Sequence, residues 1–348
     1  MKICILLALV SLLCPPCHSA IVNHHMVDVA VIGGGSSGIH AAINLKDAGA
    51  KVAVIEKKNQ IGGHAETYIN PKTKVPANVG VVLFEHTKTV QRYLSRLGVA
   101  AKENPFNTTA STKIQLNWYP GNISAIPTLY GIKKFGPGLL QHGAVVTFQQ
   151  MGKTHTIAAK KLVVTIPQTI ENMQYFDLTE TEKDLLSRFS AFGYFADVAD
   201  IPGLDVSLQN VGLRSPTKTP SIPGSNGYLL SGSPNQFLLR VGFNRSEYTV
   251  ADGKRVIHKE LETLASVGAV PASVAKTVTF PCISNHAPYD LHVTREDIKE
   301  GFYTKLTALE GYQNTYWTGA AFAGHNSGLI WKWNEETVLP ALKKDLGL

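Results

Sequence analysis

The sequence has few cysteines and no apolar run long enough to cross a bilayer. Four of its 348 residues are cysteine, and three of these (Cys4, Cys14 and Cys17) lie in the first 20 residues. If that segment is removed, Cys282 remains alone and cannot form an internal disulfide. The rest of the chain is long enough for two domains with a large core. We therefore expect its stability to come from that core and from a bound ligand rather than from covalent cross-links.

Basic residues are in excess, but they are scattered along the chain. The formal net charge is +7 and the isoelectric point is about 9.1, yet lysines adjoin one another only in pairs such as Lys57-Lys58. A nucleic-acid surface needs a denser basic stripe, so we expect no nucleic-acid partner. The charge then belongs to a solvated surface that also attracts an anionic ligand. Because no cluster of histidine, cysteine and acidic residues has metal-ligand spacing, no metal is expected.

Residues 1–20 have the pattern of a secretory signal peptide. Lys2 precedes an apolar run over residues 3–13, and small residues close the segment at Ser19 and Ala20. The run is shorter than a membrane span. The sequence therefore predicts a secreted mature chain that begins at Ala20 or Ile21. N-glycosylation sequons, which are read in the secretory pathway, occur at Asn107, Asn122 and Asn244.

A glycine-rich turn follows the first apolar run of the mature chain. Residues 29–32 are apolar and mostly β-branched, which predicts a buried parallel strand. Gly33, Gly35 and Gly38 then occupy the G-x-G-x-x-G positions. The first glycine permits the tight turn, the second lets backbone approach a pyrophosphate, and the third lets a helix pack against the strand. This spacing favours a dinucleotide site over the alternative, a glycine-rich turn that binds nothing.

The residues after these glycines continue the dinucleotide pattern. Apolar residues at helical spacing predict a helix over residues 39–48, which Gly49 is placed to end. Residues 51–55 form a second predicted strand, and Glu56 stands at its carboxyl end. Glu56 lies where a carboxylate would accept hydrogen bonds from the ribose of a dinucleotide. Strand, glycines, helix, strand and acid thus occur in the expected order.

The segment Gly62-Gly63-His64-Ala65-Glu66-Thr67 resembles the second glycine motif of the flavin amine oxidase superfamily. This resemblance implies FAD, because nicotinamide dehydrogenases lack the second glycine pair. Histidine in place of the usual arginine resembles a fungal branch of β-cyclopiazonate dehydrogenase-like oxidoreductases, and also the polyenoic fatty acid isomerases. A histidine carries charge only when protonated. His64 therefore either contacts flavin or phosphate, or is a structural loop residue.

Three further segments extend the resemblance. Residues 75–98 match the segment that passes near the flavin ring and continues into a helix, residues 160–167 match the third cofactor strand, and residues 314–328 match the closing strand and helix. The resemblance implies a discontinuous Rossmann-type FAD-binding domain of the α/β class, with an inserted, mostly antiparallel β-sheet substrate domain. The predicted FAD-binding residues are Gly33, Gly35, Ser37, Gly38, Glu56, Gly62, Gly63, His64, Gly319 and Gly328.

The predicted domains alternate along the chain. The FAD-binding domain takes residues 21–98, 144–172 and 311–348, and the substrate domain takes residues 99–143 and 173–310. This chain passes almost directly from Leu140 to a predicted hairpin over residues 144–157. Members of the family that it resembles carry a long helical block at this place. In the family that block helps to roof the substrate cavity. The substrate domain is therefore expected to be shortened, either naturally or through a missing exon.

The resemblance implies an oxidoreductase that dehydrogenates a small, largely apolar molecule, such as a secondary-metabolite intermediate, by hydride transfer to flavin N5. Two alternatives remain: a flavin-dependent isomerase of a lipid-like substrate, and a shortened flavoprotein without catalysis. Because the flavin carries the difficult step, no catalytic side chain is identified. Weaker candidates are His64 or His325 for a covalent flavin link, Glu66 or His286 as a base, an aromatic substrate wall of Tyr316, Trp317 and Trp331, and Cys282 as a small buried hydrophobe.

Overall fold

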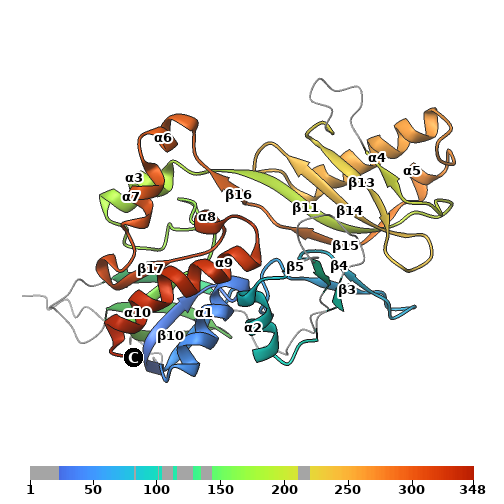
Figure 1. The fold of residues 1–348 in the computed structure, drawn as a ribbon. Helices are drawn as coiled ribbons and strands as arrows, with labels where there is room; N and C mark the ends of the chain where they lie inside the picture. The colour runs from blue at the N-terminus through green and yellow to red at the C-terminus, as the bar shows by residue number, and fades with distance from the viewer. Residues whose placement is uncertain are drawn as a thin grey trace, which may run out of the picture.

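The computed structural model describes residues 23–81, 84–100, 102–103, 113–115, 128–134, 143–210 and 220–348. It contains a mostly parallel sheet flanked by helices and, beside it, an antiparallel sheet with helices on one face (Figure 1). The predicted α/β class, with a Rossmann-like part and an antiparallel part, is confirmed. The predicted signal peptide, Asn107, Asn122 and the junction at Leu140 lie outside the described residues.

The parallel sheet has β1 (Asn23–Ile32) at its centre. It pairs with β2 (Val52–Ile55) on one side and with β10 (Lys153–Val164) on the other, and β17 (Thr315–Trp317) pairs with the end of β10. All four strands run parallel, so their carboxyl ends meet at one edge. Ligands in such folds bind outside that edge.

An antiparallel hairpin extends the same sheet. β9 (Ala144–Gln150) turns through Met151 and Gly152 into β10, and β8 (Thr128–Lys134) pairs with β9. Both turn residues have positive φ angles, 51° and 72°, as tight hairpin turns require. The predicted hairpin is confirmed. Residues 128–134, within the segment 99–143 predicted for the substrate domain, thus add a strand to the sheet that contains β1.

Helices cover both faces of this sheet (Figure 1). On one face lie α1 (Ser36–Asp47), α9 (Ser327–Trp333), a π-helix (Asn334–Val338) and α10 (Leu339–Leu346). On the other lie α3 (Glu180–Ser187) and α7 (Phe302–Thr307). The short helix α6 (Arg295–Lys299) precedes α7 and has no buried residue. Leu185 and Phe302 pack in one core cluster with Leu162 and Val164 of β10. Two helices of the segment 173–310, predicted for the substrate domain, therefore pack on the sheet that contains β10.

The antiparallel sheet forms the second part of the molecule. Its strands are β11 (Ser190–Asp200), β12 (Leu208–Gln209), β13 (Gly224–Leu230), β14 (Gln236–Phe243), β15 (Thr279–Asn285) and β16 (Tyr289–His292). Its helices are α4 (Val250–Ser266) and α5 (Val274–Thr277), and they bury one face of the sheet. The sequence of residues 275–280 predicts a strand. This prediction is wrong in part, because the first half of the segment belongs to α5, whose buried Val274 and Ala275 pack with α4.

The remaining described elements are short. They are β3 (Thr67–Ile69), β4 (Pro76–Asn78), β5 (Phe84–Glu85), α2 (Lys88–Arg96), β6 (Lys102–Glu103), β7 (Lys113–Gln115), a 3₁₀ turn (Tyr312–Asn314) and α8 (Ala320–Ala323). Ala77 and Val79 pack against Ala196 and Val198 of β11, on the face opposite α4. This contact holds β4 against the antiparallel sheet. None of the helices in the described ranges is long and apolar enough to span a bilayer.

Candidate functional site

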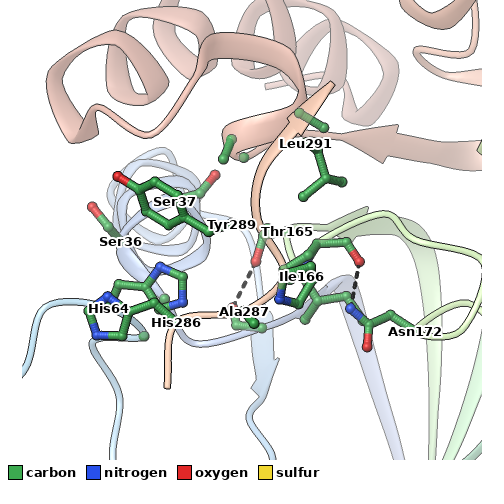
Figure 2. Close-up of a pocket in the computed structure, with 18 of the residues that line it drawn as sticks. Ser36, Ser37, His64, Thr165, Ile166, Asn172, His286, Ala287, Tyr289 and Leu291 are labelled. Atoms are coloured by element: carbon green, nitrogen blue, oxygen red, sulfur yellow. Dashed lines mark hydrogen bonds between the residues drawn. The ribbon is translucent and has the colours of Figure 1, made fainter. Parts of the chain in front are cut away.

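A cavity of about 860 Å³ lies where the carboxyl ends of the parallel strands face the antiparallel sheet. Its walls come from the glycine turn after β1, from the segment after β10 and from residues 285–291 at the edge of the second sheet. Figure 2 shows Ser36 and Ser37 at the start of α1 on one side and Asn172 on another. The seven predicted residues on its wall are Gly33, Gly35, Ser37, Glu56, Gly63, His64 and Gly319.

Gly35 and Gly63 bring the two glycine motifs into direct contact. A Cβ atom on Gly63 would lie 2.9 Å from the Gly35 Cα, whereas a Cβ on Gly35 would meet only the Gly63 Cα, at 3.7 Å. The Gly62 N–H also donates to the Gly34 carbonyl at 2.8 Å. The turn therefore exposes bare backbone to the cavity beside the N-terminus of α1. Free helix N–H groups and the helix dipole suit a pyrophosphate at this place.

Gly38, Gly62 and Gly328 do not line the cavity. A Cβ on Gly38 would lie 2.0 Å from the Gly33 carbonyl oxygen, and one on Gly328 would lie 3.1 Å from the Val90 side chain. These glycines hold the turn and the helices in close packing. The structure thus separates the predicted set into residues that face the cavity and residues that support it.

Glu56 lines the cavity at the end of β2. One carboxylate oxygen accepts the Gly34 N–H at 2.7 Å, and the other accepts the Lys58 N–H at 2.8 Å. A carboxylate has about four acceptor positions, so two remain for the hydroxyl groups of a ribose. The acid is fixed in position beside the glycine turn. Backbone, helix N-terminus and carboxylate together fit the adenosine and pyrophosphate parts of FAD.

A hydrogen-bond network holds the N-terminus of α1. The Trp331 indole N–H donates to Ser36 Oγ at 3.0 Å, and Ser37 Oγ lies 3.1 Å from Thr318 Oγ1. Asn334, at the start of the π-helix, accepts from Thr318 Oγ1 at 2.5 Å and donates to the Ser37 carbonyl at 3.1 Å. These bonds tie the first turn of α1 to the C-terminal helices. The segments at the two ends of the described chain therefore position the glycine turn together.

Five aromatic side chains form one wall of the cavity, and we call them the ring cluster: His64, Tyr194, His286, Tyr289 and His325. The His64 and His286 rings stack with centroids 4.3 Å apart, and Figure 2 shows them side by side. The Tyr289 ring stacks on the Tyr194 ring with centroids 4.5 Å apart, and its centroid lies 4.0 Å from that of the His325 ring. The backbone N–H of Asp290 donates to His325 Nε2 at 2.7 Å. Four separate chain segments thus meet in one flat-sided wall.

Burial keeps the histidines of the ring cluster neutral. It lowers the pKa of His64 to about 3 and that of His286 to about 4, and the neighbouring cations add to both effects. The pKa of His325 is also lowered, chiefly by burial, although nearby Asp290 opposes the shift. At neutral pH these side chains are therefore uncharged hydrogen-bonding groups. His64 does not supply the permanent charge of the arginine that it replaces.

Glu66 does not face the cavity. One of its carboxylate oxygens accepts from Lys58 Nζ at 2.6 Å, and the other accepts from Ser284 Oγ. This carboxylate links the second glycine motif to β15, so its role is structural and it is removed as a candidate base. His286, the other candidate, does face the cavity.

The predicted aromatic wall is wrong in its members. Tyr316, Trp317 and Trp331 are fully buried in three separate core clusters, and none lines the cavity. Tyr194 and Tyr289 take that place. No local motif marks these two tyrosines. The one signal in the sequence is the alternation of side chains along β11, which places Tyr194 on the face opposite the buried Phe195. Cys282 is partly buried in the contact between β4 and the antiparallel sheet, as a small apolar residue.

Comparison with known proteins agrees with this geometry. Residues 31–97 match the family model described as an NAD(P)-binding Rossmann-like domain. The chain is 39% identical to the FAD-dependent oxidoreductase dpchF of Colletotrichum higginsianum, over 92% of this chain and 94% of that protein. It is 26% identical to the beta-cyclopiazonate dehydrogenase of Aspergillus oryzae, over 89% and 92% respectively. The alignment with dpchF covers 447 positions, more than the 348 residues of this chain, so dpchF contains stretches without a counterpart here.

Solved structures show the same fold. A fatty acid isomerase from P. acnes, described as producing CLA, superposes with a TM-score of 0.69 at 14% identity, over 90% of this chain and 98% of that one. A variant of putrescine oxidase superposes with a TM-score of 0.57 at 11% identity, over 93% of this chain and all of the other. The cavity, its glycine turn and these relationships lead to one assignment. The chain belongs to the family of FAD-dependent oxidoreductases, and its cofactor is FAD.

Proposed function

We propose that this protein oxidises or dehydrogenates a small, largely apolar molecule by hydride transfer to flavin N5. The observation that carries the proposal is the continuity of the cavity, which runs from Gly35 and Glu56 to the ring cluster on the second sheet. A dinucleotide held at the first end would extend its reactive part toward the second. A substrate beside the ring cluster would then lie within reach of the flavin.

The side chains of this chain bind, orient and exclude water. Glu56 and the N-terminus of α1 would hold the ribose and pyrophosphate, and FAD, when bound, supplies the hydride acceptor. Apolar side chains of Ile166, Leu291 and Ile330 line the cavity. They favour a substrate with apolar surface, because its transfer from water is favourable. The ring cluster supplies the flat surface against which such a substrate is positioned.

The proposed substrate is an intermediate of fungal secondary metabolism. The support is the relationship to dpchF and to a relative named for dehydrogenation of beta-cyclopiazonate. A flavin-dependent isomerase is the second candidate, because a solved fatty acid isomerase shares the fold. The two differ in their electron balance, since an isomerase leaves both substrate and flavin with no net redox change.

Anaerobic turnover tests the proposal. Purified FAD-loaded protein is mixed, without an electron acceptor, with fractions of a fungal metabolite extract, and with linoleic acid as the isomerase probe. An oxidoreductase should bleach the flavin absorbance once and then stop until oxygen is admitted. Continued conversion of linoleic acid with an unbleached flavin would instead establish the isomerase. A protein that retains FAD but reacts in neither way would support the shortened, non-catalytic form.

We also propose that residues 1–20 direct the chain into the secretory pathway. The support is the apolar run of residues 3–13, together with Asn244, whose side chain is exposed just after β14 and accessible for glycosylation. The intact mass of material from the medium of a fungal host should correspond to a start at Ala20 or Ile21, and glycosidase treatment should reduce it. Retention of Met1 in a cytosolic protein would contradict the proposal.

A further inference from the structure

His286 presents an unpartnered polar atom on the wall of the cavity. The residue is 2% exposed, and its Nε2 atom has no hydrogen-bond partner among the described residues. A buried nitrogen without a partner costs free energy, so such groups usually meet a ligand or an ordered water. His286 follows β15 and lines the cavity, so a bound molecule can supply the missing partner.

The rings around His286 define a planar recess. The His64 ring stacks on one face of the His286 ring at an interplanar angle of 8°, and the centroid of the Tyr194 ring lies 5.9 Å from that of His286. The stacked pair of Tyr194 and Tyr289 continues the wall to His325. Aromatic walls of this kind bind flat molecules by offset stacking. The hydrogen-bonding atom of His286 is therefore set among surfaces that favour a planar ligand.

The charges around the recess disfavour a cation. Lys58 and Arg240 both act on His286 from outside the cluster, and the three histidines are neutral. The nearby carboxylates do not present a free negative charge to the recess. Glu66 is paired with Lys58, and neither Glu66 nor the exposed Asp290 lines the cavity. Among the residues that line the cavity, the carboxylates are Glu56 and Glu171. Glu56 accepts two backbone hydrogen bonds beside the glycine turn, and Glu171 adjoins Asn172 after β10, so neither belongs to the ring cluster.

We infer that the ring cluster is the substrate-recognition site, that it selects planar molecules without positive charge, and that His286 Nε2 orients them by a hydrogen bond. This inference rests on the proposed function, since it identifies the substrate class of the same cavity. It distinguishes this chain from an enzyme that accepts protonated amines, although solved amine oxidases share its fold. His286 is assigned to substrate contact, and His64 and Tyr289 are assigned to the stacking surface.

Three probes of similar size and different charge test the inference. Benzyl alcohol, benzoate and benzylammonium are titrated at pH 7 into the FAD-loaded protein, and the shift of the flavin absorbance reports binding without any turnover. We expect saturable binding of benzyl alcohol and benzoate, with benzylammonium at least about tenfold weaker. Equal or tighter binding of benzylammonium would overturn the inference. So would the absence of a shift with all three probes.

Variants separate the hydrogen bond from the stacking surface. His286→Ala should weaken the binding of benzyl alcohol about threefold to tenfold, which corresponds to the loss of one hydrogen bond. His155→Ala, which changes a histidine of β10 outside the cavity, is the matched control. Tyr289→Phe keeps the ring and should bind benzyl alcohol more tightly than Tyr289→Ala does. Unchanged affinity in His286→Ala would remove that residue from substrate contact.

The flavin spectrum also separates failure of the inference from failure of the proposed function. A protein that binds no FAD, or whose flavin no metabolite reduces, would contradict the proposed oxidation while leaving the probe preferences measurable by calorimetry. A protein that is reduced by substrate, yet binds benzylammonium as well as benzyl alcohol, would contradict only the assignment of the ring cluster. Retention of FAD in His286→Ala shows that the variant is folded.

Discussion

At the scale of single residues, Glu56 carries the contact to the ribose. Its carboxylate is already held by two backbone N–H groups, so no side-chain freedom is lost when it accepts a ribose hydroxyl. We expect Glu56→Ala to weaken FAD binding by about 1.5–3 kcal/mol, the usual worth of a hydrogen bond to a charged group. Equilibrium dialysis of the apoprotein against FAD measures this. Glu171→Ala, at another part of the cavity wall, is the control.

A side chain at Gly35 should weaken FAD binding more than truncation of Glu56 does. No atom other than the Gly63 Cα lies within 4 Å of a Cβ built on Gly35, so a larger side chain would extend into the space that the pyrophosphate requires. We expect Gly35→Val to purify as folded protein without flavin colour. Gly253→Ala, where a new Cβ would make ordinary contact with Phe195 at 3.7 Å, should retain FAD. Yellow Gly35→Val protein with normal affinity would contradict this placement of the pyrophosphate.

Asp197 is a buried carboxyl group that the proposed chemistry does not use. It is 1% exposed, neither of its oxygens has a partner among the described residues, and burial raises its pKa to about 7, although Lys254 opposes the shift. The folded protein therefore holds this proton between about pH 4 and pH 7, where the unfolded chain has lost it. The stability contributed by Asp197 is present below pH 4 and is lost as the pH rises through 7.

Replacement of Asp197 by asparagine should remove the fall in stability between pH 4 and pH 7, because asparagine has no proton to lose. We expect Asp197→Asn to match the parent near pH 4 and to exceed its free energy of unfolding near pH 8, by an amount on the order of 3 kcal/mol. Urea unfolding at both pH values measures the difference. Asp205→Asn, which changes an exposed carboxylate, should leave the pH dependence unchanged. A parallel offset of Asp197→Asn at both pH values would show that protonation is not the cause.

At the scale of elements, local sequence predicted those parts whose chemistry is local. The turn of three glycines, the helix after it and the hairpin through Met151 and Gly152 follow from residues close in sequence, and the structure has all three. The strand expected over 275–280 begins instead with α5, because packing against α4 outweighs the β propensity of valine. Tyr194 and His286 meet only through the pairing of β11 with β15, which no local pattern specifies.

Helix caps are an element-scale feature that local sequence specifies directly, as in the threonine and glutamate three residues apart at Thr179 and Glu182. Thr179 caps α3: its side chain accepts the Glu182 N–H at 3.2 Å, and the Glu182 carboxylate accepts the Thr179 N–H at 2.9 Å. We expect Thr179→Ala to lower the free energy of unfolding by about 1 kcal/mol, because the cap is lost. Thr263→Ala, on the exposed surface of α4, should change it much less. Thermal unfolding of the FAD-loaded proteins compares the two.

At the scale of the whole molecule, the chain is shorter than its relatives. The sequence was expected to be shortened after Leu140, where members of the resembling family carry a helical block that helps to roof the substrate cavity. The stretches of dpchF without a counterpart agree with such a shortening. The glycine turn, Glu56 and Gly319 are all present at the cofactor end. We therefore expect this protein to retain its cofactor but to enclose its substrate incompletely.

Flavin fluorescence measures that separation. Water exclusion strengthens electrostatic control and protects reactive intermediates, so an unroofed site should bind FAD yet turn over slowly and leak electrons to bulk oxidants. We expect iodide to quench the flavin fluorescence of the isolated protein strongly, and to quench it less once benzyl alcohol occupies the ring cluster. Protection that appears only at high protein concentration would indicate cover from a second copy. Full protection of the dilute, ligand-free protein would show that the shortened chain closes its own site, because iodide could not then reach the ring.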